Sequence, residues 1–262
     1  MDLIDSHAHL DSVGDIEGAL RRAREAGVRA IVAVGEDKES NRKNLTLKEQ
    51  CADPRILLGL GLHPGQLGDL SVDQELQYIC SHIHEADAVG EIGLDFWYKW
   101  VRKDAEKKAE QRRVYRELLV LAREHDLPAL IHTRGTWQEA VETAREVGVQ
   151  KAVFHWYSGP LKVLEEILEA GYYISASLSV AYSEEVRRAL QAAPLERILL
   201  ETDTPVFYRQ YDGGLKAEPR DVAKTLRHLS CLKGLPEEDV VRAVNTNLLR
   251  LFPGLAGMNM FS

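Results

Sequence analysis

Short apolar runs alternate with longer amphipathic, charged stretches along the whole 262-residue chain, and this order restricts the possible folds more than any other feature. A buried strand followed by a helix is the repeating unit of parallel α/β sheets. Eight candidate strands occur near residues 2–6, 28–34, 55–61, 87–91, 128–131, 151–155, 172–176 and 197–201. The pattern predicts an α/β fold, specifically a single (β/α)8 TIM barrel, a fold of about 250 residues.

Amphipathic stretches between the candidate strands predict the surrounding helices. Apolar residues recur three and four positions apart in segments 15–27, 111–126, 136–148, 159–171 and 183–193. Gly27, Gly148 and Gly171 lie just past the ends of three of these segments, where glycine commonly terminates a helix. A last helical pattern over 235–254 predicts an additional C-terminal helix packed against the barrel. Within it, Asn247 is either a buried hydrogen-bonding anchor or an ordinary helical residue.

An open, doubly wound sheet is the alternative fold. No glycine-rich phosphate-binding loop follows an early candidate strand, which argues against it. Because no linker or low-complexity tract divides the sequence, we expect residues 1–262 to form one domain.

Composition and charge limit the class of protein. No apolar run approaches the roughly 20 residues that span a bilayer, and Asp2 and Asp5 stand where a signal peptide would be positive. We therefore expect a cytoplasmic protein without membrane association. Cys51, Cys80 and Cys231 are odd in number and far apart, which argues against a disulfide framework or a thiolate zinc site. The net charge of −8 argues against non-specific coating of nucleic acid, although bound metal ions can make a nuclease site positive.

The stretch IDSHAHLD, residues 4 to 11, contains the first candidate ligands. At a strand end, alternate side chains share one face, so Asp5, His7 and His9 point the same way and the two imidazoles can bind one cation. Asp5 either orients a ligand histidine or makes a structural hydrogen bond.

Metal-binding residue types gather where the other candidate strands end, which is where barrels of this kind place their chemistry. His63, Glu91, His132, His155 and Asp203 follow the third, fourth, fifth, sixth and eighth candidate strands. The remaining histidines fall in or at the ends of helical patterns and are expected at the surface: His82, His84, His125 and His228.

The ordered motifs DSHAHLD, GLHP, GEIGLD, LIHTR, HWYSG and ETDTP resemble those of the TatD-related metal-dependent hydrolases, often called TatD deoxyribonucleases, of the amidohydrolase superfamily. The resemblance covers essentially the whole chain. It implies that one divalent metal ion is held by His7, His9, Glu91 and Asp203. It also implies a second ion held by Glu91, His132 and His155, so that Glu91 bridges the two.

The sequence departs from the family pattern in two places. Trp156 and Tyr157 follow the sixth-strand histidine where the family usually has Cys-Phe, and Gly65 stands where a histidine is common. Neither departure removes a ligand, but both alter the pocket wall.

The candidate ligands suit a hydrolytic metal site. Imidazoles mixed with carboxylates suit Zn²⁺, Mn²⁺, Fe²⁺ or Ni²⁺ and also allow Mg²⁺. Two ions about 3.5–4 Å apart would activate a bridging water and stabilise both oxygens of a phosphodiester displacement. Asp203 and Glu91 are the catalytic candidates. Asp203 either accepts a proton from the attacking water or acts only as a ligand.

Four residues are candidates for substrate binding. His63 and Arg134 could bind a phosphate oxygen, although Arg134 could equally form a surface salt bridge. The stretch DFWYKWVRK, residues 95 to 103, interleaves aromatic and cationic side chains, among them Trp97 and Lys99. Aromatic rings stack bases at about 1–3 kcal/mol each, so this loop either contacts DNA or only seals the barrel top.

The leading functional hypothesis is a metal-dependent nuclease that trims DNA from the 3′ end, as the family resemblance implies. The alternative is a small-molecule hydrolase acting on an amide, lactone or phosphoester, because a barrel fold does not fix the substrate. A scaffold protein with a vestigial site is the weakest hypothesis, because every ligand position is occupied. DNA is the expected substrate, and no obligate protein partner is evident.

Overall fold

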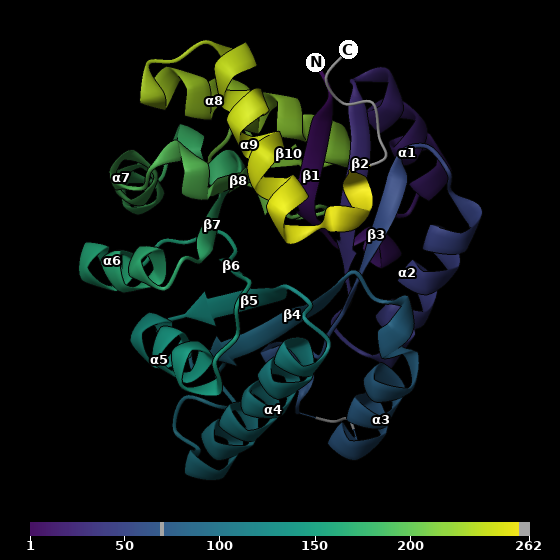
Figure 1. Ribbon diagram of the computed structural model, residues 1–262, viewed down its shortest axis with the longest axis vertical. Helices are drawn as coiled ribbons and strands as arrows, with labels where there is room; N and C mark the ends of the chain where they lie inside the picture. The colour runs from purple at the N-terminus through teal and green to yellow at the C-terminus, as the bar shows by residue number, and fades with distance from the viewer. Residues whose placement is uncertain (69–70, 257–262) are drawn as a thin grey trace.

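Eight parallel strands form a nearly closed barrel in the computed structural model, which describes residues 1–68 and 71–256 (Figure 1). Each strand pairs with the next in chain order. The strands are β1 (Leu3–Ala8), β2 (Val28–Val34), β3 (Arg55–Leu60), β4 (Ala88–Asp95), β5 (Ala129–Arg134), β6 (Ala152–Phe154), β7 (Tyr173–Ala176) and β8 (Ile198–Leu200). A parallel bridge between Ala8 and Thr204 joins the end of β1 to the segment that follows β8. The predicted (β/α)8 barrel is confirmed.

Helices surround the barrel in chain order (Figure 1). They are α1 (Ile16–Glu25), α2 (Lys38–Gln50), α3 (Val72–His82), α4 (Ala105–Glu124), α5 (Trp137–Val147), α6 (Leu161–Glu169), α7 (Glu184–Ala192) and α8 (Val222–Lys233). Asp104 starts α4 by accepting hydrogen bonds from the backbone amides of Glu106 and Lys107, at 2.9 and 3.0 Å. Gly148 ends α5 in the left-handed conformation, with φ of +81°.

Several short elements complete the connections. The link from β8 to α8 contains an antiparallel hairpin of β9 (Phe207–Tyr208) and β10 (Leu215–Lys216). Single turns of 3-10 helix occur at Leu10–Ser12, Pro64–Gln66, Ile83–Glu85, Leu178–Ala181, Leu195–Arg197, Pro219–Asp221 and Pro253–Leu255. Among the described residues, no helix combines the length and apolarity that crossing a lipid bilayer requires.

The barrel strands are buried on both faces, which explains their continuous apolar sequences. In β2, VRAIVAV, every residue except Arg29 is buried. A parallel strand covered by helices outside and by packed side chains inside has no solvent-facing side. The apolar runs in the sequence therefore mark these strands without polar alternation.

The additional C-terminal helix, α9 (Glu237–Leu251), lies against the amino ends of β1 and β8. Asn247 is 1% exposed and donates hydrogen bonds of 2.9 Å to the carbonyl oxygens of Leu195 and Ile198. Asn245 donates to the carbonyl oxygen of Asp2, also at 2.9 Å. Asn247 is thus the buried anchor of this helix, on the barrel face opposite the strand ends that carry the candidate ligands.

Candidate metal centre

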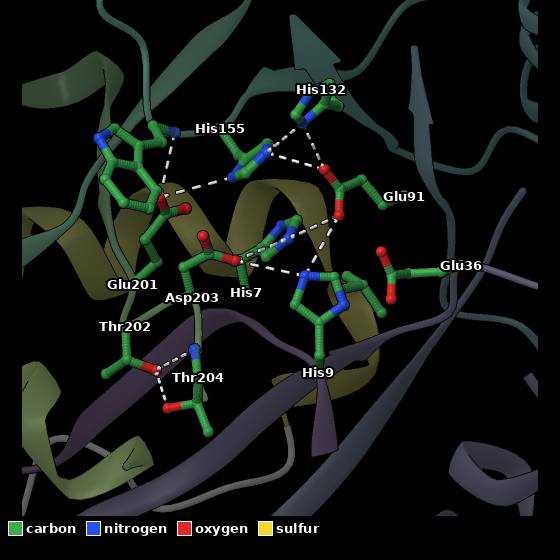
Figure 2. A network of polar contacts seen from close by, with 12 residues as sticks. His7, His9, Glu36, Glu91, His132, His155, Glu201, Thr202, Asp203 and Thr204 are labelled. Carbon is green, nitrogen blue, oxygen red and sulfur yellow. Dashed lines mark hydrogen bonds and ion pairs between the residues drawn. The ribbon is translucent and has the colours of Figure 1, made fainter. Parts of the chain in front are cut away.

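The seam between β1 and β8 brings three predicted ligands together. The amide of Asp203 donates to the carbonyl oxygen of His7 at 3.0 Å, and the amide of His9 donates to that of Thr204 at 2.7 Å. Asp203 has a φ of +52°, a conformation that few residues other than glycine adopt. These contacts fix the backbone of His7, His9 and Asp203, whose side chains converge in Figure 2.

One oxygen of Glu91 faces this first group of side chains. The Nε2 atoms of His7 and His9 each lie 3.3 Å from Glu91 Oε2. The same two nitrogens lie 3.7 and 3.3 Å from Asp203 Oδ1. Four potential ligand atoms from β1, β4 and the end of β8 therefore surround one point.

The other oxygen of Glu91 faces a second group. His132 Nδ1 and His155 Nε2 each lie 2.9 Å from Glu91 Oε1, and these two nitrogens are 3.4 Å apart. Glu91 thus lies between two groups, with one carboxylate oxygen directed to each (Figure 2). The structure brings together all six residues predicted as ligands.

Glu91 lies within β4 and not at its end. Strand β4 extends to Asp95, and β5 extends to Arg134, because the two strands stay paired through Asp95 and Arg134. The predicted ends near residues 91 and 131 were wrong. The chain directly after β3 passes close to Glu91 of β4, and this requires glycine at position 61. A Cβ on that residue would lie 2.3 Å from the Glu91 amide nitrogen.

The electrostatics of this cluster favour a cation. Burial acts to raise the pKa of Glu91, but the imidazoles of His155, His63 and His7 lower it well below its usual value. Burial acts to lower the pKa of His9, but the carboxylates of Asp203 and Glu91 raise it to about 9. Buried carboxylates here rely on neighbouring positive charge, which a metal ion can provide.

The residues present fit divalent metal ions. Asp203 Oδ1 is buried without a hydrogen-bond partner in the described part of the chain, although two imidazole nitrogens lie close to it. Ligand atoms about 2.0–2.1 Å from a tetrahedral zinc ion would be about 3.3 Å apart. The separations of 3.3 Å between His9 Nε2 and the two carboxylates match this spacing.

Two further carboxylates lie beside ligand imidazoles, Asp95 within hydrogen-bond distance and Glu201 just beyond it, and sequence reasoning did not assign them. Asp95 Oδ2 lies 3.3 Å from His132 Nε2. Glu201, fully buried, has Oε1 at 3.6 Å from His155 Nδ1 and accepts a 3.0 Å hydrogen bond from the Trp156 amide. Such partners fix the ring orientation of a metal-binding histidine. Asp95 lies in the motif GEIGLD and Glu201 in ETDTP. Their closeness in sequence to the ligands Glu91 and Asp203 was the signal that could have identified them.

Asp5 does not orient a ligand ring. Its Oδ1 accepts hydrogen bonds from the amides of Thr202 and His7, at 3.0 and 3.3 Å, and its Oδ2 accepts one from the Thr202 hydroxyl. Asp5 therefore ties β1 to the end of β8, which is the structural alternative.

His63 lies beside the second group as a neutral hydrogen-bond donor. Its Nδ1 accepts a 3.0 Å hydrogen bond from the Gly65 amide, so the proton of the neutral ring is on Nε2. That nitrogen is 3.6 Å from Glu91 Oε1. Burial lowers the pKa of His63 to about 3, which keeps the ring neutral.

The cluster opens into a cavity of about 660 Å³ at the carboxyl ends of the strands. His63 and Arg134 line it, and so does Tyr98 of the stretch DFWYKWVRK that was considered for substrate binding. Glu36, which the sequence analysis did not single out, lines it as well. Trp97 is not among the lining residues described. It is 59% exposed, and the Arg134 guanidinium lies 5.0 Å from its ring centre.

The other predicted positions lie outside the cavity. Lys99 borders a separate surface depression that it shares with Trp100 and Lys103. The four histidines expected outside the site are half-buried or exposed in the structure: His82, His84, His125 and His228. None of them is among the residues that line the cavity in the described part of the chain.

Comparison with known proteins agrees with this geometry. Residues 4–253 match the family model described as TatD related DNase. Deoxyribonuclease TATDN3 of Homo sapiens is 31% identical over 97% of this chain and 95% of its own length. The metal-dependent hydrolase YjjV of Escherichia coli K12 is 31% identical over 95% of this chain and 97% of its own. The crystal structure of YjjV, a TatD homologue, superposes with a TM-score of 0.87 at 29% identity, covering 96% of this chain and 98% of that one.

Because the family model spans nearly the whole chain and the relatives align along their full lengths, the chain belongs to the TatD-related DNase family and is a metal-dependent hydrolase that acts on ester bonds.

Proposed function

We propose that this protein is a two-metal deoxyribonuclease that removes nucleotides from the 3′ end of DNA. The observation that carries the proposal is the position of Glu91, whose two carboxylate oxygens face two separate groups of ligand atoms. The name of the human relative, a deoxyribonuclease, supports DNA as the substrate.

Each group would hold one divalent ion. His7, His9 and Asp203 would bind the first with Glu91 Oε2, and His132 and His155 would bind the second with Glu91 Oε1. Two such ions would lower the pKa of a shared water and stabilise the attacking and leaving oxygens of a phosphodiester. The donor types admit Zn²⁺, Mn²⁺, Mg²⁺, Fe²⁺ or Ni²⁺.

The surrounding residues would bind the substrate and move the proton. Asp203 lines the cavity beside His9, so its carboxylate can accept the proton of the attacking water. His63 Nε2–H and the Arg134 guanidinium can donate to phosphate oxygens. The water oxygen bonds to phosphorus as its proton passes to Asp203, and the bond from phosphorus to the 3′ oxygen of the penultimate nucleotide breaks. That oxygen takes up a proton, either the one held by Asp203 or one from solvent, and leaves as a hydroxyl. The products are a 5′-mononucleotide and a shortened strand.

Trp97 and Lys99 would contact the strand outside the cavity. The exposed Trp97 ring lies against Arg134, at the point where a strand leaving the cavity would pass. Its free surface can stack a base. Lys99 lies farther along the same loop, where only a longer strand would reach it.

The test uses metal-depleted protein reconstituted with each candidate ion in turn. We expect a 5′-labelled single strand to give a ladder of products shortened from the 3′ end, and a chelator to abolish it. A panel of small phosphodiesters, esters, amides and lactones is assayed in parallel. Rapid hydrolysis of a panel compound with no turnover of DNA would contradict the proposal and favour the small-molecule hydrolase.

A further inference from the structure

Glu36 is a carboxylate of the cavity that the proposed mechanism does not use. It follows β2, and its backbone is fixed on both sides. The Glu36 amide donates to Ser40 Oγ at 2.8 Å, and its carbonyl oxygen accepts from the His63 amide at 2.9 Å. The side chain lines the cavity, and Figure 2 shows it directed toward His9 and Glu91.

The Glu36 carboxylate receives no hydrogen bond from residues 1–68 or 71–256. The side chain is 28% exposed, and Oε1 lies 3.8 Å from His63 Nδ1. That nitrogen accepts the hydrogen bond of the Gly65 amide and therefore has no proton to donate. The carboxylate faces the cavity without a protein donor among the described residues, so its oxygens are available to a hydrogen-bond donor of a bound ligand.

The chemistry of a DNA end identifies this donor. A carboxylate accepts hydrogen bonds and repels phosphate, so Glu36 cannot bind the scissile group that His63 and Arg134 would hold. The terminal nucleotide carries its 3′-hydroxyl on the sugar next to the scissile phosphate, within one nucleotide of the metal ligands. A terminal 3′-phosphate would instead place negative charge beside Glu36 and Glu91.

Resting on the proposed nuclease function, we propose that Glu36 accepts a hydrogen bond from the terminal 3′-hydroxyl and selects strands that end in a hydroxyl. Glu36 is thus a specificity-determining residue. It would distinguish the end of a strand from its interior, where the same oxygen is esterified and cannot donate.

The experiment measures single-turnover release of the first nucleotide, because later turnovers always start from a new hydroxyl end. Three 5′-labelled single strands of one sequence end in 3′-hydroxyl, 3′-deoxy or 3′-phosphate. Wild type should release the first nucleotide about 10- to 100-fold faster from the hydroxyl end than from the deoxy end, the range for loss of a hydrogen bond to a charged group. The phosphate end should be slower still.

Two variants separate the hydrogen bond from the charge. Glu36→Ala should remove most of the preference for hydroxyl over deoxy ends. Glu36→Gln keeps the shape and removes the charge, so it should relieve the penalty on the phosphate end. Glu39→Gln is the matched control, because Glu39 is exposed on α2 and bonds Arg42 outside the cavity. This variant should keep the wild-type end preference.

The outcomes distinguish this inference from the function on which it rests. Equal wild-type rates on the three ends, or wild-type ratios in both Glu36 variants, would overturn the role of Glu36 while DNA hydrolysis stands. Cleavage of a closed circular single strand as fast as a linear one would overturn both the role of Glu36 and the 3′-end polarity of the proposed nuclease, while metal-dependent DNA hydrolysis would stand. Loss of one metal equivalent in Glu36→Gln would make Glu36 a metal ligand instead. Absence of DNA turnover by fully metal-loaded wild type would overturn both proposals.

Discussion

Replacing Glu91 with glutamine tests the central feature of the site. The substitution keeps the size of the side chain but removes the negative charge shared by two groups of ligands. An amide has one oxygen and cannot bridge two cations as a carboxylate does. We expect Glu91→Gln, and Glu91→Ala more completely, to reduce the metal content from about two ions to one or none per chain.

The magnitude follows from ligand-linked stability. An ion present at 100 times its dissociation constant stabilises the folded state by about 2.7 kcal/mol, so two ions contribute about 5 kcal/mol. Each kcal/mol shifts the melting temperature of a chain of this size by about 2–4 °C. Saturating metal should therefore raise the melting temperature of wild type by about 10–20 °C. In Glu91→Gln the rise should be less than half as large.

Hydrolysis should fall further than stability. Losing the two metal ions that stabilise the attacking and leaving oxygens raises the activation free energy by several kcal/mol. An increase of about 4 kcal/mol corresponds to a rate loss of about 10³-fold. Elemental analysis after dialysis, thermal unfolding with and without metal, and turnover of a small phosphodiester measure the three effects. Glu39→Gln is the matched control for metal content, because Glu39 is exposed on α2 and bonds Arg42 outside the cavity. Two ions bound at wild-type affinity in Glu91→Gln would refute the bridging role.

Three further variants test separate parts of the molecule. Asp203→Asn should lower hydrolysis about 10²- to 10⁴-fold in folded protein, the range for loss of a general base, and wild-type turnover would exclude proton transfer to Asp203. Trp97→Ala should weaken binding of single-stranded DNA by about 1–3 kcal/mol without slowing hydrolysis of a small phosphodiester. Lys99→Ala should have a smaller, salt-dependent effect on DNA binding. Unchanged DNA turnover in both variants would show that this loop is not part of the site. Asn247→Ala should lower the free energy of unfolding by about 1–3 kcal/mol with metal content unchanged. Thr246→Ala should be near neutral, because Thr246 is only half-buried and its hydroxyl bonds the carbonyl oxygen of Arg242 within the same helix. Equal stability of the two variants would contradict the anchor.

The strands were predictable because a strand buried on both faces is apolar throughout. Helix α2 shows where apolar periodicity fails. Its buried face carries Asn41 and Asn44, which are fully buried. Asn41 exchanges hydrogen bonds with the backbone of Gly61, and Asn44 donates to the carbonyl oxygen of Val34 at 3.0 Å. Amides that satisfy the backbone of β2 and β3 replace the apolar side chains that would have marked this helix.

The grouping of candidate ligands was predictable because a parallel barrel brings all its strand ends to one face. The same rule would have indicated Glu36, which follows β2, but no histidine drew attention to that strand end. The division of ligands between the two oxygens of Glu91 was not predictable from spacing. It depends on the position of Glu91 inside β4 and on the backbone contacts that join β1 to the end of β8.

The departures from the family pattern have structural partners elsewhere in the chain. A Cβ at Gly65 would lie 2.6 Å from the Tyr98 hydroxyl, so glycine there makes room for Tyr98 on the cavity wall. Trp156 lines the cavity with a φ of +41° and lies 5.3 Å, ring centre to ring centre, from Tyr208 of β9. The wall is therefore built from pairs, in which the loop after β3 fits the loop after β4, and the loop after β6 packs on the hairpin after β8. Because one member of each pair restricts the other, a larger side chain at position 65 would require a compensating change at Tyr98.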